Sequence, residues 1–401
     1  MINIKKRLIR LLNPALGLVL GILLIPLHSF AQESSGELQI TRTATMTSAP
    51  IPIHVSGLAG EAFKILKFDL EISGCDLVSS EKALYIAQAS SDSGITGKLT
   101  DQTGEITFFH RSYKNGTDRA LVHAYAADII KVITGQDAIF NQKIAYCINT
   151  DLDKNEIFIS DFDGHNPQQV TRDGSLIRAL TWGPDKSSLF YCSYRALNPD
   201  IYKQELYTGK RTIIANYLGL NTSPSVSPDG TQIAMIISRS GSPDLYVADI
   251  DGSNLKRLTK TQADESSPCW SPDGKYICYS SRASGSAKLY IISPDGGTPK
   301  RIITSGVGSA TEPNWSPDGK YIAFTTTTRR SFQICIVPAE GGMVEVLAEG
   351  EAPCWAPNSR TLIFHRKKDK KSSLVMLDVP TKKTKTITSI AGNASQACWS
   401  R

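Results

Sequence analysis

The sequence predicts a mainly β protein, a six-bladed β-propeller preceded by a small α/β domain, and three observations carry that prediction. A short motif recurs every 40 to 45 residues from about residue 140 to the end of the 401-residue chain. The residues before it lack the motif and contain two segments with the period of an α-helix. The last copy stops after its first strand, as expected where the end of a chain completes its first blade.

The first 31 residues have the composition of an export signal. Four basic residues within the first ten precede an apolar run from Ala15 to Leu27, and the small residues Ser29 and Ala31 follow. We interpret residues 1–31 as a signal peptide, with an uncleaved anchor as the alternative. Its removal lowers the formal net charge from +6 to +2. A nearly neutral mature chain disfavours nucleic acid as a partner, and we expect no membrane insertion after cleavage.

Residues 32–142 are expected to form a leader and then the α/β domain. The leader, 32–50, is polar and rich in Ser and Thr, which is typical of a flexible segment. Within 51–142, helical periodicity runs from Glu61 to Ser73 and from about Thr117 to Gly135. Apolar runs predict strands at 51–55, 83–87 and 106–110. Helices packed on a sheet follow from this order.

The repeat defines six blades within residues 143–401. Each copy has an apolar marker residue followed by a turn of the type Ser-Pro-Asp-Gly, then a strand such as Tyr276–Tyr279. In such a turn, Pro presets φ and Asp accepts local hydrogen bonds. Gly adopts the backbone conformation of the closing position without steric strain. The marker positions are Trp182, Val226, Trp270, Trp315, Trp355 and Trp399. Four short strands per unit at this period indicate a propeller, and the segment ending at Trp399 is expected to complete the blade that begins near Lys143.

The placement of the eight cysteines argues against disulfide bonds. Export makes disulfides possible, and the number is even. However, Cys269, Cys354 and Cys398 each precede a marker tryptophan, and Cys147 and Cys192 share another position of the repeat. Equivalent positions in different blades lie too far apart to bridge, so we interpret these cysteines as small buried apolar residues.

The mature sequence gives no positive signal for catalysis. It has no Gly-x-Ser-x-Gly turn, no His-Glu-x-x-His pair and no glycine-rich phosphate loop. We therefore predict a protein that is not an enzyme, has no cofactor and no catalytic or metal site, and acts by binding another protein.

The segments just before the markers are the predicted binding site, because loops of all blades converge at the mouth of a propeller channel. Their small polar and acidic residues suit a hydrogen-bonding collar, although ordinary solvated turns have the same composition. The candidate residues are Asn221, Thr222, Glu265, Ser266, Thr311 and Glu312. A second local feature is the basic run from Arg366 to Lys371, interrupted only by Asp369, which is either a solvated hairpin turn or a docking patch for an anionic partner.

Together these features resemble the TolB family, the periplasmic propellers of the Tol/Pal envelope system. The resemblance rests on the export signal, the α/β domain, the six blades, the closing Trp399-Ser400, and the junction from Ile133-Thr134-Gly135 into Lys143-Ile144-Ala145-Tyr146. It implies a periplasmic adaptor that binds a Pal-like peptidoglycan-associated lipoprotein at the propeller mouth and serves outer-membrane integrity and constriction during cell division. It also implies that an N-terminal segment binds a TolA-like inner-membrane protein. By position, that segment is Glu37, Leu38, Gln39 and Ile40.

The alternative function is a propeller that binds a small ligand or serves as the non-catalytic partner of an exported enzyme.

Overall fold

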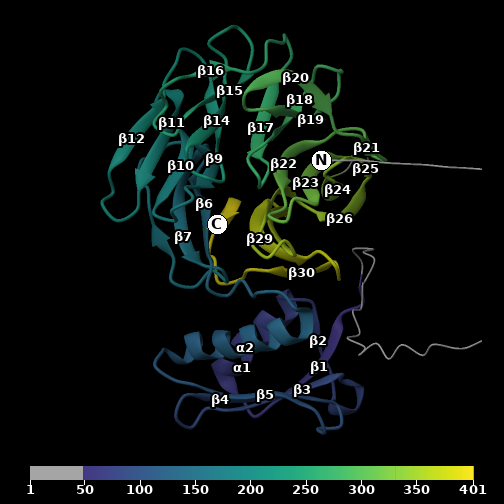
Figure 1. Cartoon of the computed structure of the whole chain (residues 1–401). Coiled ribbons are helices and arrows are strands. Elements are labelled where there is room, and N and C mark those ends of the chain that lie inside the picture. The colour runs from purple at the N-terminus through teal and green to yellow at the C-terminus, as the bar shows by residue number, and fades with distance from the viewer. Residues whose placement is uncertain (1–47, 330, 401) are drawn as a thin grey trace, which may run out of the picture. The chain divides into compact units, whose positions relative to one another are not determined.

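The computed structural model describes residues 48–329 and 331–400, and it has the predicted fold class (Figure 1). A five-stranded sheet with two helices comes first in the chain, and six four-stranded sheets follow. The predicted signal peptide, most of the leader and the segment Glu37–Ile40 lie outside the described residues. Within the described residues, no helix is long and apolar enough to cross a membrane.

The α/β domain has the strand order β2-β1-β3-β4-β5 and two α-helices. Its elements are β1 (Ile51–Ser56), α1 (Gly60–Ile72), β2 (Cys75–Leu77), a 3₁₀ turn (Ser80–Lys82), β3 (Tyr85–Ser90), β4 (Ile95–Asp101), β5 (Thr107–Tyr113) and α2 (Asp118–Thr134). The Thr117 hydroxyl caps α2 by accepting a hydrogen bond from Ala120 N, and Gly135 ends it with φ 73°. Both predicted helices and three strands are confirmed, whereas β2 and β4 were not predicted.

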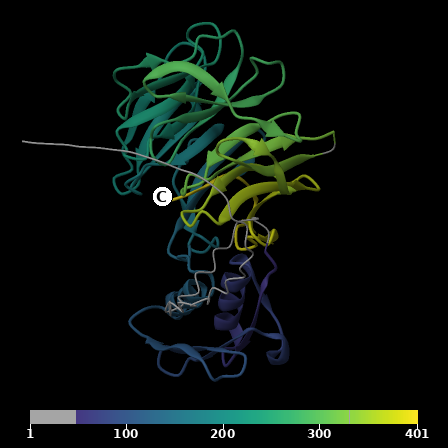
Figure 2. The ribbon, with the colours of Figure 1, turned by 45° about the vertical axis from the view of Figure 1, so that its right-hand side comes forward.

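Each later four-stranded sheet is one blade of the propeller, which Figure 2 shows from another side. We number the blades from the one that contains β6. Blade one is β31 (Asn393–Trp399), β6 (Lys143–Asp151), β7 (Lys154–Asp161) and β8 (Gln168–Gln169). Blade two is β9 (Ile177–Trp182), β10 (Ser188–Ala196), β11 (Asn198–Glu205) and β12 (Arg211–Ala215). Blade three is β13 (Asn221–Val226), β14 (Gln232–Ile237), β15 (Asp244–Asp249) and β16 (Lys256–Arg257).

The remaining three blades follow the same antiparallel plan. Blade four is β17 (Glu265–Trp270), β18 (Ile277–Ser281), β19 (Lys288–Ser293) and β20 (Gly296–Arg301). Blade five is β22 (Thr311–Trp315), β23 (Tyr321–Thr327), β24 (Phe332–Pro338) and β26 (Glu345–Glu349), with the short pair β21 (Thr304–Ser305) and β25 (Gly342–Met343) beside it. Blade six is β27 (Glu351–Trp355), β28 (Thr361–Lys368), β29 (Lys371–Asp378) and β30 (Lys383–Thr386).

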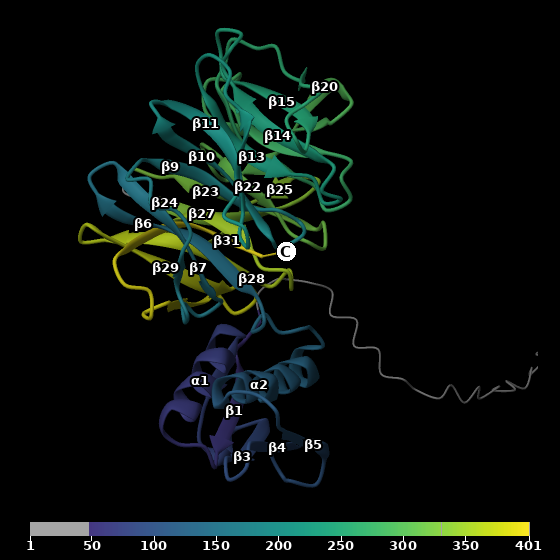
Figure 3. The ribbon, with the colours of Figure 1, turned by 90° about the vertical axis from the view of Figure 1, so that its left-hand side faces the viewer.

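The ring is closed as predicted, because the C-terminal strand β31 pairs with β6 (Figure 3). Asn393 lies opposite Asn149, and Trp399 lies opposite Ile144. Lys143 N donates to the Ser400 hydroxyl at 3.0 Å, and Ser400 N donates to Lys143 O at 2.9 Å. The innermost strand of every blade contacts those of its two neighbours.

The repeated motif builds turns and packing between blades. Ser271 Oγ and Ser316 Oγ donate at 2.6 Å to Asp273 and Asp318, the acidic residues of their own turns. Trp270 Nε1 donates to Ser225 O of the preceding blade at 2.9 Å. In these blades the motif therefore has a structural role.

The eight cysteines are buried, as predicted, and none of them is in a disulfide. The register places Cys269 directly opposite Cys278 within blade four. Comparing equivalent positions between blades could not reveal this pair, because its two members lie on neighbouring strands of one blade.

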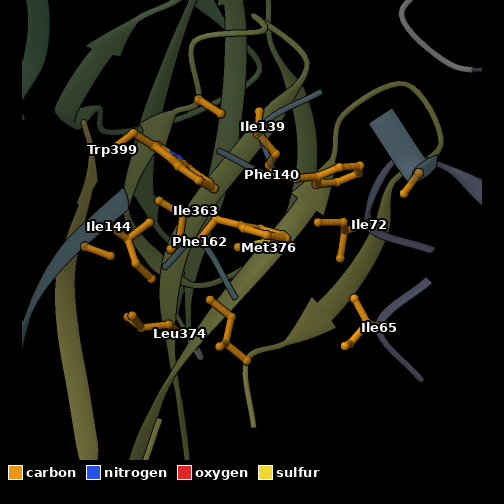
Figure 4. Packing of buried hydrophobic residues seen from close by; sticks show 14 of the residues in the cluster. Ile65, Ile72, Ile139, Phe140, Ile144, Phe162, Ile363, Leu374, Met376 and Trp399 are labelled. Carbon is orange, nitrogen blue, oxygen red and sulfur yellow. The ribbon is translucent and has the colours of Figure 1, made fainter. Parts of the chain in front are cut away.

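One apolar cluster joins the two α-helices to blades one and six (Figure 4). Ile65 and Ile72 of α1 belong to the same cluster as Phe162 and Met376 of the propeller. Charged contacts surround it, with ion pairs of Lys385 with Glu71, of Lys383 with Asp76 and of Arg119 with Asp163. The helices and the propeller are thus held together by both apolar packing and ionic contacts.

Candidate functional site at the channel mouth

The innermost strands of all six blades surround a cavity of about 950 Å³. Small and polar residues form much of its wall, including Thr222, Ser223 and Ser267. Prolines of the marker turns and residues next to the marker tryptophans line it as well. A cavity of this size can admit a peptide segment or a small molecule.

Each innermost strand contains a β-bulge. The bulge residue lies three positions before the marker residue of that strand. The six bulge residues are Ala179, Ser223, Ser267, Glu312, Ala352 and Gln396, with φ between 51° and 54°. The strand register shifts at each of these positions, which is the mark of a β-bulge. None is glycine, so each occupies a left-handed conformation that costs roughly 1–2 kcal/mol for an ordinary residue.

Side chains of neighbouring blades support two of these bulges. Ala179 N of blade two donates to Gln396 Oε1 of blade one at 2.7 Å. Ala352 N of blade six donates to Glu312 Oε2 of blade five at 2.9 Å. In both pairs, one bulge residue binds the backbone of the next, so the contacts run around the channel wall.

The six residues predicted for the propeller mouth all lie at one end of the channel. They begin the innermost strands rather than forming loops. Asn221 and Glu265 point into the protein. The Asn221 amide is buried and bonds to Tyr217 N and O and to Pro199 O. Both residues anchor the links between blades, a role that the sequence pattern did not distinguish from partner binding.

The Glu265 carboxylate is surrounded by hydroxyl donors of blades three and four. It accepts hydrogen bonds from Thr259 Oγ1 at 2.9 Å, Thr261 Oγ1 at 2.8 Å and Ser281 Oγ at 3.1 Å. Burial raises the pKa of this carboxyl above its ordinary value, and the hydroxyl donors oppose that rise. Glu265 thus holds the link between blades three and four in place at the mouth.

Of the other four candidates, Thr222 and Glu312 line the cavity. Burial raises the pKa of Glu312, while the hydrogen bonds from Thr325 and from Ala352 N oppose that rise. Thr311 Oγ1 donates to Thr325 O at 3.2 Å within its own blade. Ser266 and Thr311 do not line the cavity, so the structure brings together only part of the predicted collar.

The charged wall of the channel brings together residues that the sequence analysis did not group into one site. Glu351 faces Lys367 Nζ at 3.4 Å and His365 Nε2 at 3.9 Å, and all three line the cavity. Burial lowers the pKa of His365, which favours the neutral imidazole. Arg178 lines the cavity from blade two, at the repeat position that Thr222 occupies in blade three. Alignment of the repeats could have revealed Arg178, whereas the grouping around Glu351 requires the strand register.

This wall can bind charged and polar groups of either sign. It offers carboxylates, basic side chains and hydroxyls within one cavity. Within the described residues, no group of three or more His, Cys, Asp or Glu is placed to hold a metal ion.

The PD40 family, described as the TolB beta propeller domain, matches residues 130–401. The chain belongs to this TolB propeller family. Its similar relatives include the Tol-Pal system protein TolB of Francisella tularensis subsp. holarctica, 36% identical over 137 residues, which are 32% of each chain. The protein of that name from Desulfosudis oleivorans is 32% identical over 143 residues, covering 35% of this chain and 32% of the relative. These matches span about a third of the curated relatives' length.

The crystal structure of TolB from Acinetobacter baumannii resembles this chain over a much greater length. It covers 88% of this chain and 97% of its own, with a TM-score of 0.78 and 23% sequence identity. At this identity the likeness establishes the fold: TolB has the same α/β part and propeller.

Proposed function

We propose that this chain is a periplasmic, non-enzymatic adaptor of the Tol-Pal envelope system. It binds a Pal-like peptidoglycan-associated lipoprotein through the propeller mouth and a TolA-like inner-membrane protein through the N-terminal segment Glu37–Ile40. In this role it supports outer-membrane integrity and constriction during cell division. The observation that carries the proposal is a family match over the whole propeller, together with relatives named as Tol-Pal proteins.

The geometry of the channel supports a protein partner at the mouth. Thr222, Glu312 and Glu351 approach the cavity from three different blades and belong to strands fixed by hydrogen bonds. A rigid site of this kind binds without a large ordering cost, as expected of an adaptor whose partner docks onto a preformed surface.

The test is calorimetric titration of residues 32–401 with the periplasmic domain of the Pal-like lipoprotein from the same genome. Thr222→Arg is the informative variant, because Arg178 occupies the equivalent position in blade two and an arginine therefore fits the strand. We expect it to weaken binding at least about ten-fold by filling the mouth. Thr208→Arg, in the exposed turn at the opposite end of blade two, is the matched control. A folded protein that does not bind the lipoprotein would overturn the proposal.

The second partner is tested separately. A chain lacking residues 37–40 should lose binding to the TolA-like periplasmic domain and retain binding to the lipoprotein. Loss of neither interaction would place the TolA contact elsewhere.

A further inference from the structure

The mouth where the innermost strands begin also carries the hairpins between the second and third strands of each blade. Glu351, the first residue of β27, pairs with His365 near the end of β28, and Asn393 pairs with Asn149 near the end of β6. The strand register therefore brings the β6–β7, β10–β11 and β28–β29 turns to this mouth. The link between β12 and β13 also reaches it, because Ala215 pairs with Ile201 near the start of β11.

Three leucines project from this mouth. Leu152 in the β6–β7 turn is 86% exposed, Leu197 in the β10–β11 turn 92%, and Leu218 in the β12–β13 link 86%. Among the described residues, one other large apolar side chain is more than four-fifths exposed, Tyr207 in a turn at the opposite end of blade two. Single exposed leucines are common on protein surfaces, whereas several at one mouth are typical of a surface that contacts another protein.

The basic hairpin between β28 and β29 lies at the same mouth, on blade six, which adjoins blade one. Its two-residue turn, Asp369-Lys370, has positive φ at both positions, as in a type I′ hairpin. Lys367, Lys368, Lys370 and Lys371 are exposed. Lys367 pairs with Glu351, and Arg366 donates to Glu349 O. This hairpin thus places exposed positive charge at one end of the row of leucines.

We infer that the three leucine tips and the lysine hairpin together dock a folded protein with an acidic patch next to apolar pockets. This inference rests on the proposed function and gives the chemistry of the lipoprotein face that must meet the mouth. Apolar anchors supply binding energy in such an interface, while opposite charges orient the partner and accelerate its association.

A protein partner fits this surface better than an anionic membrane does. The exposed Asp151 and Asp153 flank Leu152 at the tip of blade one. Lys154 pairs with Asp151, so the tip carries a net charge of −1, and its insertion into an anionic lipid surface would bring like charges together. A protein surface can instead match a positive hairpin on one blade and an acidic tip on the next.

The test compares two double variants with the same change in net charge, using the periplasmic domain of the Pal-like lipoprotein as the probe. Lys368→Glu/Lys371→Glu lowers the net charge of residues 366–371 from +4 to 0 and avoids the left-handed turn positions of the hairpin. Lys275→Glu/Lys320→Glu reverses two exposed lysines of marker turns at the opposite end of the propeller. We expect the hairpin variant to bind about ten-fold more weakly and with a weaker salt dependence, and the control to bind as the unchanged protein does.

Leu197→Ser tests the apolar part, with Tyr207→Ser as its exposed control. We expect Leu197→Ser to weaken binding several-fold with little change in salt dependence. If the lipoprotein binds and Thr222→Arg weakens it while the hairpin and leucine variants match their controls, the inference is overturned and the proposed function stands. Hairpin-dependent binding to vesicles of equal parts phosphatidylglycerol and phosphatidylethanolamine, without such dependence for the lipoprotein, would also overturn it.

Discussion

Asp69 combines an ionisable side chain with complete burial. Its side chain is fully buried on α1, and His123 Nδ1 of α2 lies 2.7 Å from its Oδ2. Among the described residues, its Oδ1 has no hydrogen-bond partner. His123 Nε2 lies 4.0 Å from Asp163 Oδ2 of blade one, and Arg119 pairs with Asp163. Burial raises the pKa of Asp69 from an ordinary value of 3.8 to about 6, although His123 and Arg119 both oppose the rise.

Replacement of Asp69 by Asn should make the stability of the protein less dependent on pH. Because the pKa of Asp69 is higher in the folded state, its contribution to stability is fully present below about pH 4 and is lost as pH rises through 6. The stability of Asp69→Asn relative to the unchanged protein should therefore increase between pH 4 and 7, by up to about 3 kcal/mol. Urea unfolding at several pH values measures this difference.

Asp137→Asn, at an exposed position of the same domain, is the control for replacing a carboxylate with an amide. A constant difference between Asp69→Asn and the unchanged protein from pH 4 to 7 would contradict the prediction.

Among the elements, those with strong local signals could be predicted and those fixed by distant contacts could not. The two helices have regular apolar spacing, and α2 also has a threonine cap and a closing glycine. Strand β4 contains Gly97, which normally weakens a strand, but a Cβ there would lie 2.3 Å from the Tyr125 ring of α2. The glycine is required by a residue 28 positions away, so no window of the sequence around β4 could reveal its purpose.

The bulges of the channel wall could not be predicted for a similar reason. Ala, Ser, Glu and Gln occupy left-handed positions where sequence rules expect Gly or Asn. The surrounding strands impose this conformation, so the only trace in the sequence is the constant spacing of three residues before each marker. The closing strand, by contrast, could be predicted because an incomplete first unit and an incomplete last unit complement each other.

Loss of β31 should destabilise the entire propeller. A chain ending at residue 392 lacks the innermost strand of blade one and its contacts with blades two and six. We expect low thermal stability and rapid proteolysis of blades one and six, because the ring then has exposed strand edges. Limited proteolysis followed by mass spectrometry locates the first cuts.

A milder variant serves if the truncated chain does not fold. Trp399 is 1% exposed, and Trp399→Ala should lower the free energy of unfolding by about 3–5 kcal/mol. Ser400→Ala removes one hydroxyl contact with Lys143 N and should cost about 1 kcal/mol. Equal effects of the two substitutions would contradict a closure based on packing.

At the scale of the whole molecule, stability depends on packing and hydrogen bonds rather than on covalent links. Each blade of a propeller packs one face against the preceding blade and the other face against the next blade. The buried apolar residues are therefore distributed over six interfaces between blades. All eight thiols are buried, although Cys269, Cys354 and Cys398 also line the channel. Burial raises the pKa of Cys75, Cys147 and Cys335 to about 12. Buried thiols of this kind are protonated near neutral pH and react slowly, because the thiolate is the reactive form.

The folded protein should therefore keep its buried thiols unreactive even under oxidising conditions. Residues 32–401 should show almost no reaction with a thiol reagent such as DTNB while folded, and eight thiols should react after unfolding in guanidinium chloride. A reductant should leave the midpoint of thermal unfolding unchanged, since no native crosslink constrains the unfolded chain. Cys269 and Cys278 face each other across blade four and provide the sharpest check. Six reactive thiols after unfolding, together with a lower midpoint in reductant, would show that this pair is bridged, and Cys278→Ala would then remove the effect of the reductant.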